Sequence, residues 1–338
     1  MNLSALSALL AEQPKYRLNQ INQALYRDLI EDWDAITELP KELRQQLKEK
    51  CPLNINAELF ESSDKNTIKS LVTLNDQRQI ETVLMKHAGG RNTVCVSCMV
   101  GCPMGCTFCA TGEMKLARKL TSNEIIEQVL FWSRYLKKDN KRVSGVVFMG
   151  MGEPLLYYET TMEAVKTLND QKLFNIGARH ISISTCGVLS GINKLADSGL
   201  PINLAISLHA SNDAIRQKLM PIANSQTINE LLSTVDDYIK KTNRKVMFEY
   251  LMIENINDLE EHAYELVKLL QGKLCFVNLI QYNPTGVYTP SSQTRIKYFK
   301  DILQKNGVST TIRFRFGQDI EGACGQLANK RIQKNGSV

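Results

Sequence analysis

Residues 95–112 read CVSCMVGCPMGCTFCATG, and this stretch holds five of the nine cysteines of the chain. Cys102, Cys106 and Cys109 follow a CxxxCxxC spacing, and nearby glycines let the backbone fold closely around a compact group. Thiolates are the usual protein ligands of iron–sulfur clusters. Three thiolates leave one iron of a four-iron cluster open, and an open iron can bind a substrate. We therefore expect a [4Fe-4S] cluster on this loop.

A zinc site is the alternative for the same cysteines. Structural zinc takes four ligands, often as two CxxC pairs, and Cys95 with Cys98 and Cys106 with Cys109 offer two such pairs. This arrangement leaves Cys102 unused and separates the pairs by an unusually short spacer, so we favour the cluster. Three cysteines elsewhere are predicted to be structural: Cys51, Cys186 and Cys275.

Strands alternate with helices from about residue 93 onward. Several strands are apolar and β-branched on both faces, as in VSGVVFM and INLAISL, which is typical of a parallel sheet that is buried on both sides. We therefore expect an α/β barrel, open or closed. The candidate strands are 93–97, 143–149, 180–185, 202–207, 246–252, 276–281 and 309–314.

The chain divides into four predicted segments. Residues 1–70 look helical and basic, and residues 71–92 form a hairpin and linker, with the hairpin itself starting near residue 67. The barrel follows over residues 93–290. Residues 291–338 add a C-terminal helix, a strand and a loop that contains Cys324.

The composition is that of an ordinary globular protein of 338 residues, 43% of them hydrophobic. No apolar run reaches the ~18 residues of a membrane span. The N-terminal stretch lacks the basic and apolar regions of a signal peptide, so we expect a cytoplasmic protein. The net charge of +6 permits a nucleic-acid partner but does not establish one.

Polar motifs follow the predicted strands at their carboxyl ends, which is the edge where parallel α/β barrels assemble active sites. Gly152 can let a ligand approach the backbone, and Glu153 can accept hydrogen bonds from a ligand ammonium group. The other polar motifs at this edge are Ser184, Ser207 with Leu208 and His209, Asn283, and Cys324.

Six motifs occur in one order along the chain: CVSCMVGCPMGCTFCATG, FMGMGEP, SISTCG, AISLHA, YNP and DIEGACGQL. Together they resemble the RlmN/Cfr family of radical S-adenosylmethionine (SAM) RNA methyltransferases, over about residues 10–330. ACGQL discriminates best, because most radical SAM enzymes have nothing like it. The resemblance implies a partial (β/α)6 TIM-like barrel, a small N-terminal helical domain, and a C-terminal extension that carries a reactive cysteine.

The resemblance also implies roles for individual residues. Cys102, Cys106 and Cys109 resemble the cluster ligands. Cys324 resembles the cysteine that carries the methyl group, Cys95 the cysteine that later pairs with it, and Glu81 the proton acceptor. The residues that resemble SAM contacts are Gly152, Glu153, Ser184, Ser207, Leu208, His209 and Asn283.

The family mechanism implies two SAM molecules per turnover. One methylates Cys324, and the second is cleaved to a radical that takes hydrogen from this methyl group. The resulting methylene radical adds to an adenine carbon and crosslinks RNA to protein. Glu81 then removes the ring proton, and Cys95 attacks the Cys324 sulfur, which releases the RNA and leaves a disulfide to be reduced. Radical addition suits an electron-poor ring carbon that cannot attack SAM as a nucleophile.

The implied product is methyladenosine in 23S ribosomal RNA, with transfer RNA as a further candidate substrate. Pro154 favours the C2 enzymes over the C8 enzymes of the Cfr type. Two alternatives stay open at this stage: a radical SAM enzyme that acts on a non-RNA substrate, and a non-catalytic, zinc-stabilised RNA-binding protein. ACGQL and Cys95 argue against the first of these, and iron content would exclude the second.

The implied partners are RNA and a reducing electron donor such as flavodoxin or ferredoxin, and we expect a monomer. Cys98 departs from the family pattern, which more often has Ser or Thr there. Basic residues that could hold phosphates lie in the N-terminal segment and around the Cys324 loop: Lys15, Arg17, Arg27, Lys41, Arg44, Arg313, Arg315, Lys330 and Arg331.

Overall fold

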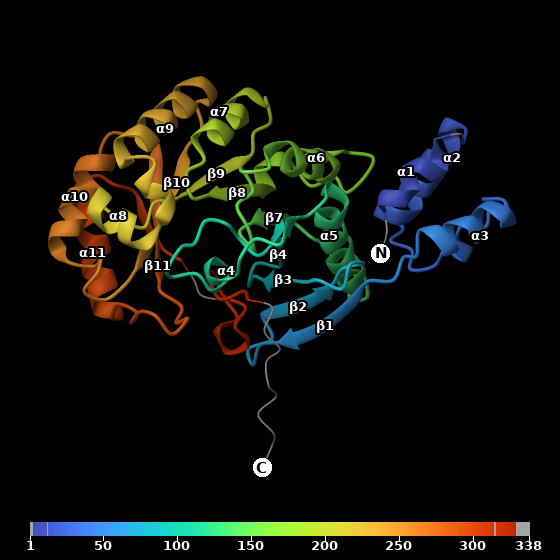
Figure 1. Cartoon of the computed structure of the whole chain (residues 1–338), viewed down its shortest axis with the longest axis horizontal. Helices are drawn as coiled ribbons and strands as arrows, with labels where there is room; N and C mark the ends of the chain where they lie inside the picture. Colours follow the sequence, from blue (N-terminus) through green and yellow to red (C-terminus); the bar gives the residue numbers. More distant parts are fainter. Residues whose placement is uncertain (1–2, 12, 314–315, 329–338) are drawn as a thin grey trace, which may run out of the picture.

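A curved sheet of ten strands forms the centre of the computed structural model, which describes residues 3–11, 13–313 and 316–328. The strand order is β1-β2-β3-β4-β7-β8-β9-β10-β11-β12. Figure 1 shows the sheet bending into part of a barrel, with helices packed along its outer face. No helix among the described residues is long and apolar enough to cross a membrane.

The parallel part of the sheet runs from β4 to β12 and confirms the expected α/β partial barrel. Each predicted strand is present within a few residues of its expected limits. The strands are β4 (Asn92–Cys95), β7 (Gly145–Phe148), β8 (Ile181–Thr185), β9 (Asn203–Ser207), β10 (Val246–Met252), β11 (Cys275–Gln281) and β12 (Thr310–Ile312).

Amphipathic helices connect these strands and cover the outer face. Capping boxes open two of them, at Thr121 with Glu124 and at Thr227 with Glu230, because each threonine and glutamate satisfy the first free backbone N–H groups. The helices are α5 (Ser122–Lys137), α6 (Tyr158–Asn169), α7 (Leu189–Asp197), α8 (Asp213–Leu219), α9 (Ile228–Thr242), α10 (Glu260–Leu270) and α11 (Gln293–Lys305).

An antiparallel extension continues the sheet beyond β4. It consists of β1 (Asn56–Glu61), β2 (Thr67–Thr73) and β3 (Gln79–Lys86), and β3 pairs with β4. The predicted hairpin is therefore confirmed. β1 was not predicted: residues 56–61 fall in the segment expected to be helical, and that expectation was wrong for this stretch. β1 pairs with β2 along its whole length, and Phe60 is the one buried residue of the strand.

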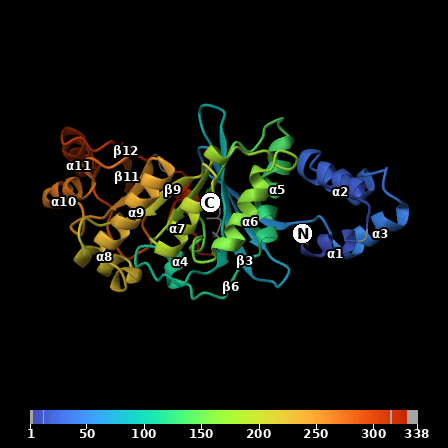
Figure 2. The same cartoon turned by 90° about the horizontal axis from the view of Figure 1, so that it is seen from above.

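The N-terminal segment also contains three α-helices joined by short turns and loops: α1 (Ser4–Leu10), α2 (Lys15–Asn22) and α3 (Lys41–Lys50). They enclose a small core around Trp33, whose indole N–H donates to the Cys51 carbonyl at 2.7 Å. Arg134 of α5 donates to the Leu53 carbonyl at 2.9 Å and so ties this unit to the barrel. Figures 1 and 2 both place α1, α2 and α3 beside α5, at the end of the molecule away from α10 and α11.

Candidate active site

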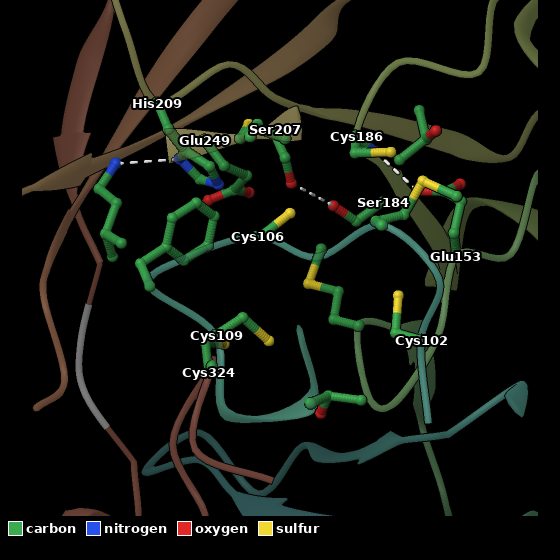
Figure 3. Close-up of a pocket in the computed structure, with 18 of the residues that line it drawn as sticks. Cys102, Cys106, Cys109, Glu153, Ser184, Cys186, Ser207, His209, Glu249 and Cys324 are labelled. Atoms are coloured by element: carbon green, nitrogen blue, oxygen red, sulfur yellow. Dashed lines mark hydrogen bonds between the residues drawn. The ribbon is translucent and has the colours of Figure 1, made fainter. Parts of the chain in front are cut away.

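One pocket lies at the carboxyl edge of the parallel strands, where the polar motifs were expected to meet. Figure 3 shows side chains from several strands and from the cysteine loop around this space. The structure brings the following predicted site residues into its wall: Cys102, Cys106, Cys109, Gly152, Glu153, Ser184, Ser207, His209 and Cys324.

The cysteine loop follows β4 and passes through the short strand β5 (Met99–Val100) before the short helix α4 (Ala110–Glu113). Gly101 has φ +77°, and a Cβ there would lie 2.2 Å from the Lys115 carbonyl oxygen, so only glycine fits. A Cβ at Gly112 would lie 2.4 Å from the Cys106 carbonyl oxygen. The loop is therefore compact because its glycines allow backbone segments to touch.

The thiol arrangement fits a multi-iron cluster better than one zinc ion. Cys102, Cys106 and Cys109 border the same pocket, which gives it the three thiolates that a four-iron cluster with one open iron requires. Cys95 and Cys98, which the zinc alternative requires, are buried and do not line this pocket. The Cys98 thiol instead donates to the Met151 carbonyl at 3.6 Å.

Burial changes the acid–base behaviour of the cluster-loop thiols. Desolvation raises the pKa of Cys102 to about 11, and it also raises the pKa of Cys109. A bound metal reverses this preference, because coordination stabilises the thiolate.

Glu153 places a carboxylate in the pocket wall, and only 3% of the residue is exposed. Its Oε2 accepts from the Cys186 N–H at 2.7 Å and its Oε1 from the Leu155 N–H at 3.0 Å. Burial nevertheless raises the pKa of Glu153. A ligand ammonium group would offset this desolvation, which makes Glu153 a suitable partner for the amino group of an amino-acid ligand.

Gly152 supports this position through its backbone. Its φ is +105°, and a Cβ there would lie 2.6 Å from Met99 Cγ and 2.9 Å from Cys98 Sγ. Glycine at this turn therefore lets the segment after β7 pack against the start of the cysteine loop.

Hydroxyl and imidazole groups come from the next two strands. Ser184 at the end of β8 and Ser207 at the end of β9 have their Oγ atoms 3.4 Å apart (Figure 3). His209 accepts from the Leu251 N–H through Nδ1 at 3.1 Å, which leaves its Nε2–H as a donor. Its ring packs edge-on against Phe108 of the cysteine loop. These groups can bind hydroxyl or carboxylate oxygens.

Two predicted SAM contacts lie outside the wall of this pocket. Leu208 is completely buried, and its backbone N–H donates to the Glu249 carbonyl at 3.1 Å. The side-chain amide of Asn283 bonds to the C-terminal loop. It donates to the Cys324 carbonyl at 3.0 Å and accepts from Gln318 at 3.1 Å. In this structure, Asn283 thus holds the Cys324 loop.

The Cys324 loop packs directly on the cysteine loop. The Ala110 N–H donates to the Gly325 carbonyl at 2.7 Å, and the Thr111 hydroxyl donates to the Leu327 carbonyl. Figure 3 shows Cys324 next to Cys109. The segment around residue 324 is far from residues 102–109 in sequence, but it closes one side of their pocket.

A second, smaller pocket lies behind Cys324. Cys95, Arg313 and Cys324 all line it, and both cysteines are free thiols. Burial and, to a lesser extent, the nearby Cys324 raise the pKa of Cys95 to about 12, and Arg313 opposes the shift. The structure therefore brings together the two cysteines that were expected to react with each other.

Glu81 lies on β3 and is completely buried. Its Oε2 accepts from the Ala328 N–H at 2.8 Å, and its Oε1 lies 2.9 Å from the ammonium of Lys69. Glu81 contacts the end of the Cys324 loop and is not part of the wall of the main pocket.

Three further residues were missed as site residues. Glu249 on β10 lines the pocket, accepts from Asn278 at 3.0 Å, and lies 3.5 Å from Arg313. Arg313 was expected to hold RNA phosphates, and Lys69 was not singled out from the sequence. Glu249 and Lys69 each stand alone as a charge in an apolar strand, in VMFEYLM and TIKSLVT, and this signal could have identified them. Arg315, Lys330 and Arg331 lie outside the described residues.

Comparison with known proteins places these features in a family context. Residues 96–267 match the model of the Radical SAM superfamily. A relative from Symbiobacterium thermophilum, named "Probable dual-specificity RNA methyltransferase RlmN", is 42% identical over 99% of this chain and 92% of its own length. A relative from Nitrosopumilus maritimus, named "Ribosomal RNA large subunit methyltransferase N", is 42% identical over 93% of this chain and 92% of its own.

A solved structure matches the whole fold. The crystal structure of a radical SAM methyltransferase from Sphaerobacter thermophilus superposes with a TM-score of 0.93, at 42% identity, and covers 98% of both chains. The partial barrel, the antiparallel extension and the N-terminal helices are therefore arranged alike in the two molecules.

Proposed function

Because the chain belongs to the RlmN family of radical SAM RNA methyltransferases, we propose that it methylates carbon C2 of an adenine in 23S ribosomal RNA, with transfer RNA as a second substrate. The observation that carries the proposal is the position of Cys324, which lies on a loop docked against the three-cysteine loop. A radical SAM enzyme that only cleaves SAM has no need of a fourth thiol there. The dual-specificity names of several relatives support two RNA substrates.

The radical SAM family binds a [4Fe-4S] cluster and SAM, and the pocket residues fit both. Cys102, Cys106 and Cys109 would hold the cluster, while Glu153 and the polar residues of β8 and β9 would hold SAM, two molecules in each turnover. When bound, these groups supply the methyl group and a carbon radical.

Three protein side chains would carry out the remaining steps of the reaction. Cys324 receives the methyl group and carries it to the adenine carbon, which links RNA and protein covalently. Glu81 accepts the ring proton. Cys95 attacks the Cys324 sulfur and releases the RNA, and an external reductant restores the two thiols. The shared small pocket of Cys95 and Cys324 supports this pairing.

The proposal also covers the cellular location, the electron donor and the RNA-binding surface of the protein. We infer a cytoplasmic monomer that receives electrons from a small donor protein such as flavodoxin or ferredoxin. The unit of α1, α2 and α3 is proposed to bind RNA through its exposed basic side chains.

The test is nucleoside mass spectrometry on ribosomal RNA that lacks its own methylation. Anaerobic, cluster-loaded protein is incubated with SAM and a reductant, and Cys324→Ala is compared with Cys275→Ala, which removes a buried thiol on β11 outside the site. We expect 2-methyladenosine with the wild type and Cys275→Ala and none with Cys324→Ala. Methylation at C8 would move the protein to the Cfr type. SAM cleavage without RNA methylation would remove the substrate assignment.

A further inference from the structure

A buried ion pair joins two strands of the antiparallel extension. The Lys69 ammonium on β2 lies 2.9 Å from Glu81 Oε1 on β3, and the two side chains are 1% and 0% exposed. Lysine and glutamate are almost never buried this fully unless they are paired. Packed apolar residues of similar volume often stabilise a fold at least as well as a buried ion pair, so stability alone does not account for this one.

Strand register places this pair on the same face as the reactive cysteines. Lys69 is opposite Val83, and Val83 is opposite Cys95, so the three residues form a row across β2, β3 and β4. Directly opposed residues of antiparallel strands point to the same side of the sheet, and Glu81, two residues before Val83, shares that side. The ion pair therefore faces the Cys324 loop.

The pair contacts that loop on both sides of Cys324. Glu81 Oε2 accepts from the Ala328 N–H at 2.8 Å, and the Lys69 ammonium reaches the Glu321 carbonyl at 3.5 Å. Figure 1 shows the C-terminal loop lying against β2 and β3. Both charges are thus held where the loop that carries the methyl group docks.

A carboxylate in such a place stays ionised only if a cation compensates for its lost hydration. Lys69 provides this charge at 2.9 Å. Without it, a buried Glu81 would favour the protonated form, which cannot accept a proton.

We propose that Lys69 is a positioning residue of the methylation reaction: it keeps Glu81 ionised and aimed at the Cys324 loop, so that Glu81 can accept the adenine proton. The inference rests on the proposed function. In this step the ring C–H bond breaks, its electron pair stays in the ring, and the proton forms an O–H bond on the Glu81 carboxylate. Methyl transfer to Cys324 does not need Lys69.

The experiment measures proton removal directly. In a Cys95→Ala background, the RNA–protein adduct cannot be released, and RNA deuterated at the accepting adenine carbon reports proton loss as loss of deuterium from the trapped adduct. Lys69→Met, which keeps chain length but removes the charge, is compared with Lys86→Met. Lys86 lies on the same hairpin, where its ammonium makes a partly exposed pair with Glu61 at 3.7 Å and lies 5.9 Å from the centre of the Tyr135 ring.

We expect Lys69→Met to slow deuterium loss at pH 7 at least tenfold, with Cys324 methylation unchanged, and Lys86→Met to match the parent. The slowed step should recover between pH 7 and pH 9, since loss of the ammonium raises the pKa of Glu81 and higher pH restores its ionised form. Among the described residues, the ionisable groups that lie on the elements contacting Glu81 include Lys69 on β2, position 95 on β4, and Glu321 and Cys324 on the C-terminal loop. Because position 95 is alanine in this background, its titration does not contribute.

Deuterium loss in Lys69→Met as fast as in the parent at pH 7 would overturn the inference. If Lys69→Met fails to fold or to bind iron, the pH dependence of the Cys95→Ala parent provides the test. The inference requires that the rate of deuterium loss in the parent stays constant from pH 6 to pH 9. A rate that rises through neutral pH contradicts the inference. Lys69→Arg, which keeps the charge, should restore most of the rate. A parent that forms no adduct at all would remove the proposed function and with it the inference.

Discussion

Glu153 holds a negative charge in a place from which water is nearly excluded. Two backbone N–H groups, of Leu155 and Cys186, satisfy part of the carboxylate, but burial still raises its pKa. A cationic ligand beside Glu153 would therefore stabilise its ionised form. This is the behaviour expected of a residue that recognises the amino group of SAM.

Glu153→Gln should weaken SAM binding to the cluster-loaded protein by about tenfold or more, because a charge-assisted hydrogen bond becomes a neutral one. Equilibrium binding of SAM measures the effect. Glu159→Gln is the matched control, since Glu159 on α6 is exposed and pairs with the exposed Lys194 at 2.8 Å. Equal affinities for the two variants would mean that the amino group binds elsewhere.

His209 makes the site sensitive to acid. Burial, followed by the nearby Arg216, lowers its pKa to about 3, so the folded protein holds the ring neutral. The unfolded chain binds a proton below about pH 6.5, and the folded state does not until far lower pH, so stability falls as the pH decreases. His209→Asn keeps an acceptor for the Leu251 N–H and removes this titration.

From pH 7 to pH 5, the free energy of unfolding of the wild type should fall by about 2 kcal/mol more than that of His209→Asn. Urea unfolding at both pH values, with equal cluster occupancy, checks the difference. Parallel losses in the two proteins would show that His209 is protonated in the folded state.

At the level of secondary-structure elements, the parallel strands and the edge where their motifs meet could be predicted from sequence. Apolar β-branched runs mark a doubly buried strand whatever its partners, and the polar residue that follows each run must then lie at the carboxyl edge. β1 could not be recognised in the same way, because a short edge strand with one buried face carries few apolar residues.

Contacts that depend on register and long-range docking could not be predicted. The pairing of Lys69 with Glu81 requires the exact alignment of β2 and β3, and the bond from Ala328 to Glu81 joins residues 247 apart in sequence. Asn283 shows the same limit: its motif indicated a polar role at the edge, while the structure has it bonded to the Cys324 carbonyl.

Docking of the Cys324 loop on the cysteine loop depends on a few hydrogen bonds, and Thr111 makes a buried one to the Leu327 carbonyl. Thr111→Val leaves that carbonyl without this donor, at a cost of about 1–3 kcal/mol. The loop should then open more often, so Cys324 should react with iodoacetamide about fivefold faster or more. Thr161→Val is the control, because Thr161 donates to the Pro154 carbonyl at 2.7 Å in α6, away from the loop. An unchanged rate of alkylation would show that other contacts suffice to hold the loop.

At the scale of the whole molecule, a large RNA must bind so that its target base reaches a pocket at the edge of the barrel. The N-terminal unit is fixed to the barrel rather than free: the Leu3 N–H donates to Glu127 of α5 at 3.0 Å, and Arg27 donates to the carbonyl of Gln171, just after α6. Its basic side chains therefore have a defined position relative to the pocket. Arg27 and Arg44 already have protein partners, and Arg17 is half-buried and lies over the Tyr16 ring. Lys15 and Lys41 are both exposed and are therefore the better candidates for phosphate binding.

Reversing these two charges should weaken RNA binding without affecting the radical chemistry. Lys15→Glu/Lys41→Glu is expected to lower the affinity for ribosomal RNA by about tenfold at moderate salt. It should also reduce the dependence of log K on log salt by about one for each phosphate that the variant no longer neutralises. SAM cleavage should stay at the wild-type rate, because the pocket lies in the barrel.

The control, Lys240→Glu/Lys297→Glu, makes the same change in net charge on α9 and α11, at the other end of the molecule (Figure 1). If both double variants bind RNA with equally reduced affinity, the attraction comes from net charge alone. A loss confined to the N-terminal variant would mean that the helical unit holds the RNA while the target base enters the pocket.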